Sequence, residues 1–102
     1  MEEIYNYPSV FDVNGPFPRK IAHRYIWAAL FDVDGVFNAT VIHLTILEKY
    51  GVDIKAQVIG KCLVDLCQTK YLERIPVYPS SHHFKYCLTQ RFLHIKRKWS
   101  EN

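Results

Sequence analysis

The stretch Phe31-Asp32-Val33-Asp34-Gly35-Val36 places two carboxylates one residue apart, directly after a short apolar run. That run, Tyr25-Ile26-Trp27-Ala28-Ala29-Leu30-Phe31, has the length and composition of a buried β-strand. A strand over residues 25–33 would deliver Asp32 and Asp34 to its carboxyl end. Because a carboxylate pair in that position can hold Mg²⁺ and attack phosphorus, the stretch indicates phosphoryl-transfer chemistry.

The composition is that of one small globular domain. Of the 102 residues, 49% are hydrophobic and 23% are charged, as in ordinary folded proteins. No apolar run reaches the roughly 20 residues that a membrane-spanning helix needs. The three cysteines are an odd number in a chain with no secretory leader, so we expect an intracellular protein, most simply a cytoplasmic one.

Prolines and glycines divide the chain into an extended N-terminal arm over residues 1–20 and a single small domain over 21–102. Within the domain, the apolar run predicts a strand over 25–33. The next apolar pattern predicts a helix over Ala39–Tyr50, which Gly51 ends.

Two further helices are expected in the second half of the chain. Asp53 is a candidate cap for one of them, and residues 62–73 repeat an apolar stripe that runs through Ile59, Leu63, Leu66 and Cys67. The other is an amphipathic helix over residues 80–99. Its apolar side chains recur at spacings of three and four along one face, which we expect to be an interface: Phe84, Leu88, Phe92, Ile95 and Trp99.

The stretch over residues 31–36 resembles the first motif of the haloacid dehalogenase superfamily. Downstream, residues 46–53 are similar to the end of the first cap helix in its phosphoglucomutase-like and phosphatase members. Residues 58–66 resemble the next cap element, a helix that begins at glycine. The resemblance covers residues 25–70 and implies an α/β (or α+β) fold, with a partial Rossmann-like core strand, helical cap elements and the C-terminal amphipathic helix.

The resemblance also implies roles for individual residues. Asp32 would be the nucleophile that forms an aspartyl phosphate, and Asp34 the general acid and then the base. Gly35 would let the backbone approach the phosphate of a small phosphorylated metabolite, and Asp32 and Asp34 would hold Mg²⁺ against it. The family's later Ser or Thr, its Lys and its final acidic pair have no match beyond residue 70. We therefore expect a truncated or reduced phosphatase, weak or inactive by itself.

Other interpretations stay open. Asp34-Gly35 also fits a two-residue hairpin turn between residues 28–33 and 36–41, and residues 11–17 repeat the same Phe-Asp-Val-Asx-Gly pattern. The chain also fits a small basic, aromatic-rich accessory subunit of a protein or ribonucleoprotein assembly. Such a subunit would bind protein partners through its N-terminal arm and C-terminal helix. Nucleic-acid binding by that helix is less favoured, because its aromatic residues belong to the apolar stripe.

The cysteines and histidines also offer a possible zinc set, made of Cys62, Cys67, His82, His83 and Cys87. On a helix, however, Cys62 and Cys67 lie about 140° apart and do not share a face. We therefore interpret these thiols as small buried hydrophobes.

Overall fold

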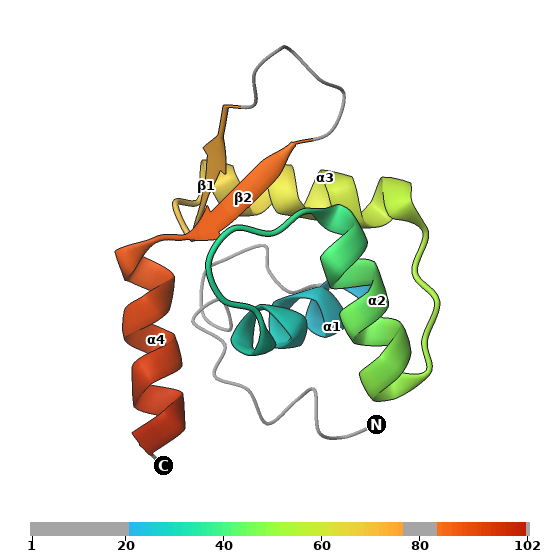
Figure 1. Ribbon diagram of the computed structural model, residues 1–102, viewed down its shortest axis with the longest axis horizontal. Helices are drawn as coiled ribbons and strands as arrows, with labels where there is room; N and C mark the ends of the chain where they lie inside the picture. Colours follow the sequence, from blue (N-terminus) through green and yellow to red (C-terminus); the bar gives the residue numbers. More distant parts are fainter. Residues whose placement is uncertain (1–20, 77–83, 102) are drawn as a thin grey trace.

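A computed structural model describes residues 21–76 and 84–101, and over these ranges the chain is an α+β protein (Figure 1). The α+β class is therefore confirmed, whereas the N-terminal arm lies outside the described residues. The elements follow in this order: α1 (Ile21–Ala29), the 3₁₀ turn η2 (Leu30–Asp32), α2 (Ala39–Tyr50), α3 (Ala56–Gln68), β1 (Leu72–Ile75), β2 (Lys85–Leu88) and α4 (Gln90–Glu101).

In the segment expected to be a strand, residues 25–33, the backbone is instead helical as far as Asp32, where η2 continues α1, and only Val33 is extended. Every residue from Tyr25 to Phe31 is buried. A short run that is apolar on all sides suits a core helix as well as a central strand, and periodicity alone cannot separate the two. The strand prediction was wrong for this reason. The Rossmann-like core strand is absent from the described residues, whose only sheet is the antiparallel pair β1–β2.

Helix α2 has the bounds that the sequence predicts. The side chain of Asn38 caps its start by accepting a hydrogen bond from Val41 N at 3.0 Å. Gly51 ends it with a φ of +69°, and the Gly51 N–H donates to Leu47 O at 2.9 Å. Glycine adopts this left-handed conformation without the steric cost that a Cβ imposes, which explains why the helix stops there.

Helix α3 has the predicted apolar face but different ends. Ile59, Leu63 and Leu66 are fully buried, as the stripe indicated. The helix begins at Ala56, so Asp53 does not cap it, and Gly60 lies in its interior rather than at its start. The helix ends at Gln68, and the stripe does not continue to Glu73 as expected, because residues 72–75 pair with β2 as strand β1.

The helix expected over residues 80–99 begins only at Gln90, because β2 occupies Lys85–Leu88. Leu88 pairs with Leu72 across the hairpin, and Phe84 is 44% exposed beside the strand. These two side chains are therefore not part of a helical stripe. An apolar residue at every fourth position also fits a strand that is followed by a helix, and backbone pairing with β1 decided between them.

The remaining stripe residues hold α4 against the core. Phe92 is fully buried, and its ring lies 4.9 Å from the rings of both Trp27 and Phe31 in edge-to-face geometry. Ile95 and Trp99 are partly buried against the same cluster. This part of the predicted interface is therefore used within the chain. No helix within 21–76 or 84–101 is long and apolar enough to cross a membrane.

Candidate functional site

The two predicted catalytic carboxylates are each paired with a lysine from a different helix. Asp32 Oδ2 lies 2.8 Å from Lys49 Nζ of α2. Asp34 Oδ1 lies 2.8 Å from Lys96 Nζ of α4, and the same ammonium donates to Val33 O at 2.7 Å. These ion pairs tie the end of η2 to α2 and the segment after it to α4.

The phosphatase hypothesis needs further metal ligands beside Asp32 and Asp34, and the described residues supply none. Among the described residues, no group of three or more His, Cys, Asp or Glu side chains is close enough to share a metal ion. The roles of Asp32 and Asp34, the Mg²⁺ between them and the phosphate contact of Gly35 stay predictions from the sequence.

The hairpin interpretation of Asp34-Gly35 is wrong. Gly35 does turn the chain, with a φ of +66°. The segment that follows pairs elsewhere, however, because Phe37 and Tyr86 exchange backbone hydrogen bonds of 2.9 and 2.8 Å. Phe37 thereby joins the edge of the β1–β2 hairpin, and the loop bridges from η2 to α2.

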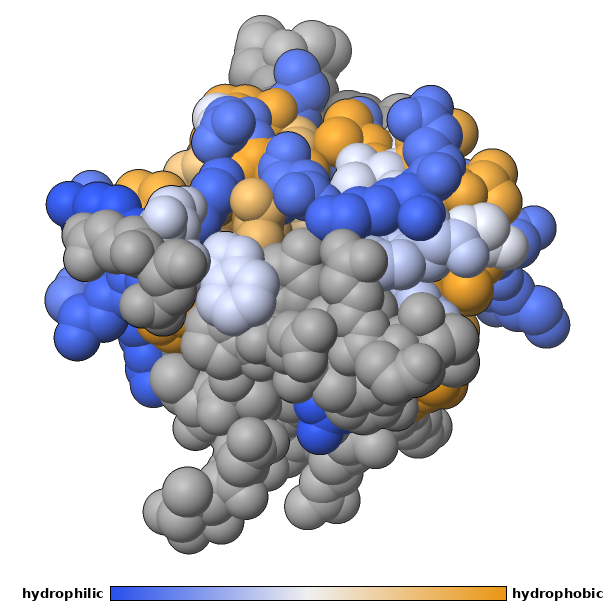
Figure 2. All heavy atoms as spheres, turned by 90° about the horizontal axis from the view of Figure 1, so that it is seen from below, coloured by the Kyte–Doolittle hydropathy of each residue, from blue (hydrophilic) through white to orange (hydrophobic). Residues whose placement is uncertain are grey.

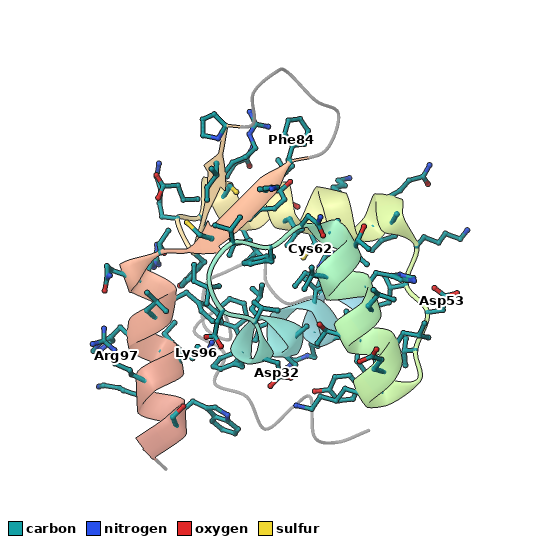
Figure 3. The ribbon with its side chains drawn as sticks, in the orientation of Figure 1. Asp32, Asp53, Cys62, Phe84, Lys96 and Arg97 are labelled. Atoms are coloured by element: carbon teal, nitrogen blue, oxygen red, sulfur yellow. The ribbon has the colours of Figure 1, made fainter. Side chains whose placement is uncertain are left out.

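The cysteines fit the interpretation as small hydrophobes. Cys62 lies on the buried side of α3 (labelled in Figure 3), and burial raises the pKa of its thiol far above the ordinary value, with a smaller contribution from Asp65. Burial also raises the pKa of the half-buried Cys67, against an opposing effect of Arg74. A raised pKa disfavours the thiolate that metals bind. The predicted ligands His82 and His83 lie outside the described residues.

Helix α3 also carries a polar face that the sequence patterns above did not predict. Spacings of four, three and four residues align four exposed side chains on the side opposite the buried stripe: Gln57, Lys61, Val64 and Gln68. Gly60 lies beside them, between Gln57 and Val64 on the helix surface. A Cβ added at Gly60 would meet no atom within 4 Å. The signal was present in the sequence as the complement of the apolar stripe.

Helix α3 is held against α2 by a short turn over residues 51–55. His43 of α2 anchors this turn, with Nδ1 3.0 Å from Ile54 O and Nε2 3.6 Å from Asp53 Oδ1. The contact with a carbonyl oxygen requires the proton on Nδ1. In Figure 1, α2 and α3 cross one another.

Basic side chains flank this polar face. Lys55 lies at the amino end of α3, and the hairpin that follows carries the exposed Arg74 and Lys85. The Arg74 guanidinium stacks over the Phe84 ring at 4.4 Å from its centroid (Figure 3 labels Phe84). Along the described part of the chain, α2, a short turn and α3 are followed by the β1–β2 hairpin, with exposed basic side chains at the start of α3 and on the hairpin.

No protein-family model matches the chain, and no curated protein matches it significantly. One solved structure, the crystal structure of Rv1404 from Mycobacterium tuberculosis, has a similar fold, with a TM-score of 0.57 at 19% sequence identity. The match covers 76% of this chain and 50% of that chain, so this chain spans about half of its length. At this identity the similarity concerns the fold alone.

Proposed function

We propose that the chain binds double-stranded DNA through the helix-turn-helix of α2 and α3, with α3 entering the major groove. The proposal rests on the exposed polar face of α3, a helix that follows α2 after a short turn. In DNA-binding proteins of this kind the second helix lies in the major groove and the first crosses the backbone. The turn over residues 51–55 is slightly longer than the usual three to four residues.

The side chains on this face suit base edges. The amides of Gln57 and Gln68 can make paired hydrogen bonds with adenine, and Lys61 can donate to the acceptors of guanine. Val64, which is 41% exposed, offers an apolar contact for the methyl group of thymine. Gly60 leaves no side chain between them, which permits close approach of the helix backbone to DNA.

The flanking cations suit the phosphates on either side of the groove. Lys55, Arg74 and Lys85 are exposed around α3, and none of their side chains is in an ion pair within the described ranges that would compete for a phosphate. Such contacts supply much of the affinity for DNA but carry no sequence information. The proposal therefore assigns positioning to these three residues and base recognition to the outer face of α3.

The test is titration of a fluorescent random-sequence pool of duplex DNA at low salt, followed by anisotropy. We expect binding that weakens as salt rises. The slope of the logarithm of the binding constant against the logarithm of the salt concentration should become shallower by about one unit in Lys55→Ala, which removes a phosphate contact. Lys98→Ala, on α4, is the matched control for charge and should leave the affinity unchanged. Circular dichroism of both variants verifies the fold. Absence of binding by the folded wild-type chain, or equal losses in the two variants, would refute the proposal.

A further inference from the structure

Helix α2 is apolar on the side that faces solvent as well as on the side that faces the core. Its residues Ile42 and Ile46 are fully buried. The opposite side exposes three large apolar side chains: Val41 at 40%, Leu44 at 47% and Leu47 at 38%. A helix that is apolar all round is normally covered on both sides, because exposed apolar area is unfavourable in water.

The three exposed side chains form a continuous line, which we call the α2 stripe (Val41, Leu44 and Leu47). Successive members are three residues apart, and Leu44, in the middle, lies directly opposite Ile42 and Ile46 around the helix. Figure 2, seen from below, shows hydrophobic surface toward the right, the side on which α2 lies in Figure 1. Scattered exposed apolar side chains are normal in proteins, whereas neighbouring ones mark an interaction site.

The α2 stripe has nothing to attract a phosphate backbone. Lys49, the only lysine or arginine in α2, lies on another side of the helix and is paired with Asp32 at 2.8 Å. The residues that border the stripe four positions from Leu44 are Thr40 and Glu48, one neutral and one acidic. Because phosphate contacts dominate the affinity for nucleic acids, these features favour an apolar protein surface as the partner.

The α2 stripe is complementary to itself in one arrangement. When two α2 helices run antiparallel about a two-fold axis at Leu44, the two Leu44 side chains meet, and Val41 of each copy meets Leu47 of the other. Every contact along the stripe is then between apolar side chains. We propose that the α2 stripe is a dimer interface with a second copy of this chain in this antiparallel arrangement. Two-fold contacts of this kind are by far the commonest in homo-oligomers.

The charges at the ends of α2 favour the same arrangement. Glu48 is exposed in the last turn of α2, where the negative end of its own helix dipole repels it. The first turn of α2 has no acidic side chain to balance the positive end. In the antiparallel pair, Glu48 of each copy lies beside Thr40 in the first turn of the other, and each carboxylate gains a favourable neighbour. A parallel pair would instead bring the two Glu48 carboxylates together.

The inference does not rest on the proposed binding of DNA. The α2 stripe and the outer face of α3 have no residue in common, and the test below contains no DNA. Because the stripe is short, we expect a weak dimer, with a dissociation constant on the order of 100 µM.

The test is sedimentation equilibrium of the full chain from about 5 µM to about 500 µM, where we expect a monomer–dimer equilibrium. Leu44→Glu should raise the dissociation constant at least about tenfold, because two carboxylates then face each other at the axis. The matched control is Val64→Glu on α3, since Val64 is 41% exposed and lies outside the stripe. It should leave dimerisation unchanged. Glu48→Lys should weaken the dimer by a smaller factor than Leu44→Glu.

A mixing experiment tests the antiparallel register. Val41→Glu and Leu47→Lys should each dimerise at least about tenfold more weakly than the wild type when alone, because a charge is buried without a partner. An equimolar mixture of the two variants should dimerise more tightly than either one, because the introduced carboxylate faces the introduced ammonium across the axis. If mixing restores nothing, the antiparallel arrangement is wrong.

The proposal is overturned if the folded wild-type chain stays monomeric up to about 500 µM, well above the expected dissociation constant. It is also overturned by a dimer that Leu44→Glu leaves intact, or that Leu44→Glu and Val64→Glu weaken equally, because the interface then lies elsewhere. Circular dichroism and urea unfolding of each variant separate loss of the dimer from loss of the fold.

Discussion

Replacement of Gly60 by alanine should make the protein more stable. Glycine inside a helix costs about 0.8–1.0 kcal/mol relative to alanine, because the unfolded chain loses more conformational freedom. Gly60 lies in the interior of α3, where the backbone is helical, and a Cβ there meets no atom within 4 Å. Neither strain nor a clash offsets the gain. We therefore expect the free energy of unfolding to rise by about 1 kcal/mol in Gly60→Ala.

Gly51→Ala is the matched control. The same methyl group is added with no atom within 4 Å, but Gly51 has a φ of +69°. Alanine in the left-handed region costs roughly 1–2 kcal/mol, so this variant should be less stable than the wild type. The two substitutions are chemically identical, and the difference in sign comes only from the backbone conformation.

Thermal unfolding monitored by circular dichroism measures both effects. For a domain of this size, 1 kcal/mol shifts the Tm by roughly 4–8 °C, upward for Gly60→Ala and downward for Gly51→Ala. If α3 enters the major groove closely, Gly60→Ala should also weaken binding to duplex DNA while the fold becomes more stable. A Tm for Gly60→Ala that is equal to or below that of the wild type would refute the reasoning about open space on α3.

Three further predictions concern the loop, the buried thiol and the proposed nucleophile. Lys96→Met should lower the free energy of unfolding in urea by about 1–3 kcal/mol, because the largely buried ammonium donates to Val33 O. Asp34→Ala, at a carboxylate 91% exposed, should cost less than about 1 kcal/mol, and equal losses would contradict this account. Because burial raises the pKa of the Cys62 thiol above its ordinary 9.0, the unfolded chain releases this proton first as pH rises. The free energy of unfolding should therefore decrease above roughly pH 9, by at most about 1.4 kcal/mol per pH unit. In urea titrations at several pH values, Cys62→Ala should make this decrease smaller. If the decrease is the same in Cys62→Ala as in the wild type, other groups cause it. If Asp32 accepts a phosphoryl group, the chain should hydrolyse a phosphomonoester in the presence of Mg²⁺. Asp32→Asn should abolish this activity and leave the circular dichroism spectrum unchanged. Activity retained in the variant would exclude the hypothesis.

Local sequence signals determined the parts of the fold that depend on local chemistry. The ends of α2 follow from an asparagine cap and a left-handed glycine, both of which act within one helical turn. The buried stripe of α3 follows from helical periodicity, which is a property of consecutive residues. The sequence therefore determined α2 and the inner face of α3 before any tertiary contact was considered.

Tertiary structure alone decided the elements with ambiguous patterns. The apolar run from Tyr25 to Phe31 is buried on all sides, so its own sequence could not distinguish a strand from α1 and η2. Residues 85–88 form β2 because β1, which precedes it in the same hairpin, supplies backbone partners outside the segment itself. The lysine partners of Asp32 and Asp34 come from α2 and α4, Lys96 from more than 60 positions away. Such pairings depend on packing between distant segments, which no local pattern encodes.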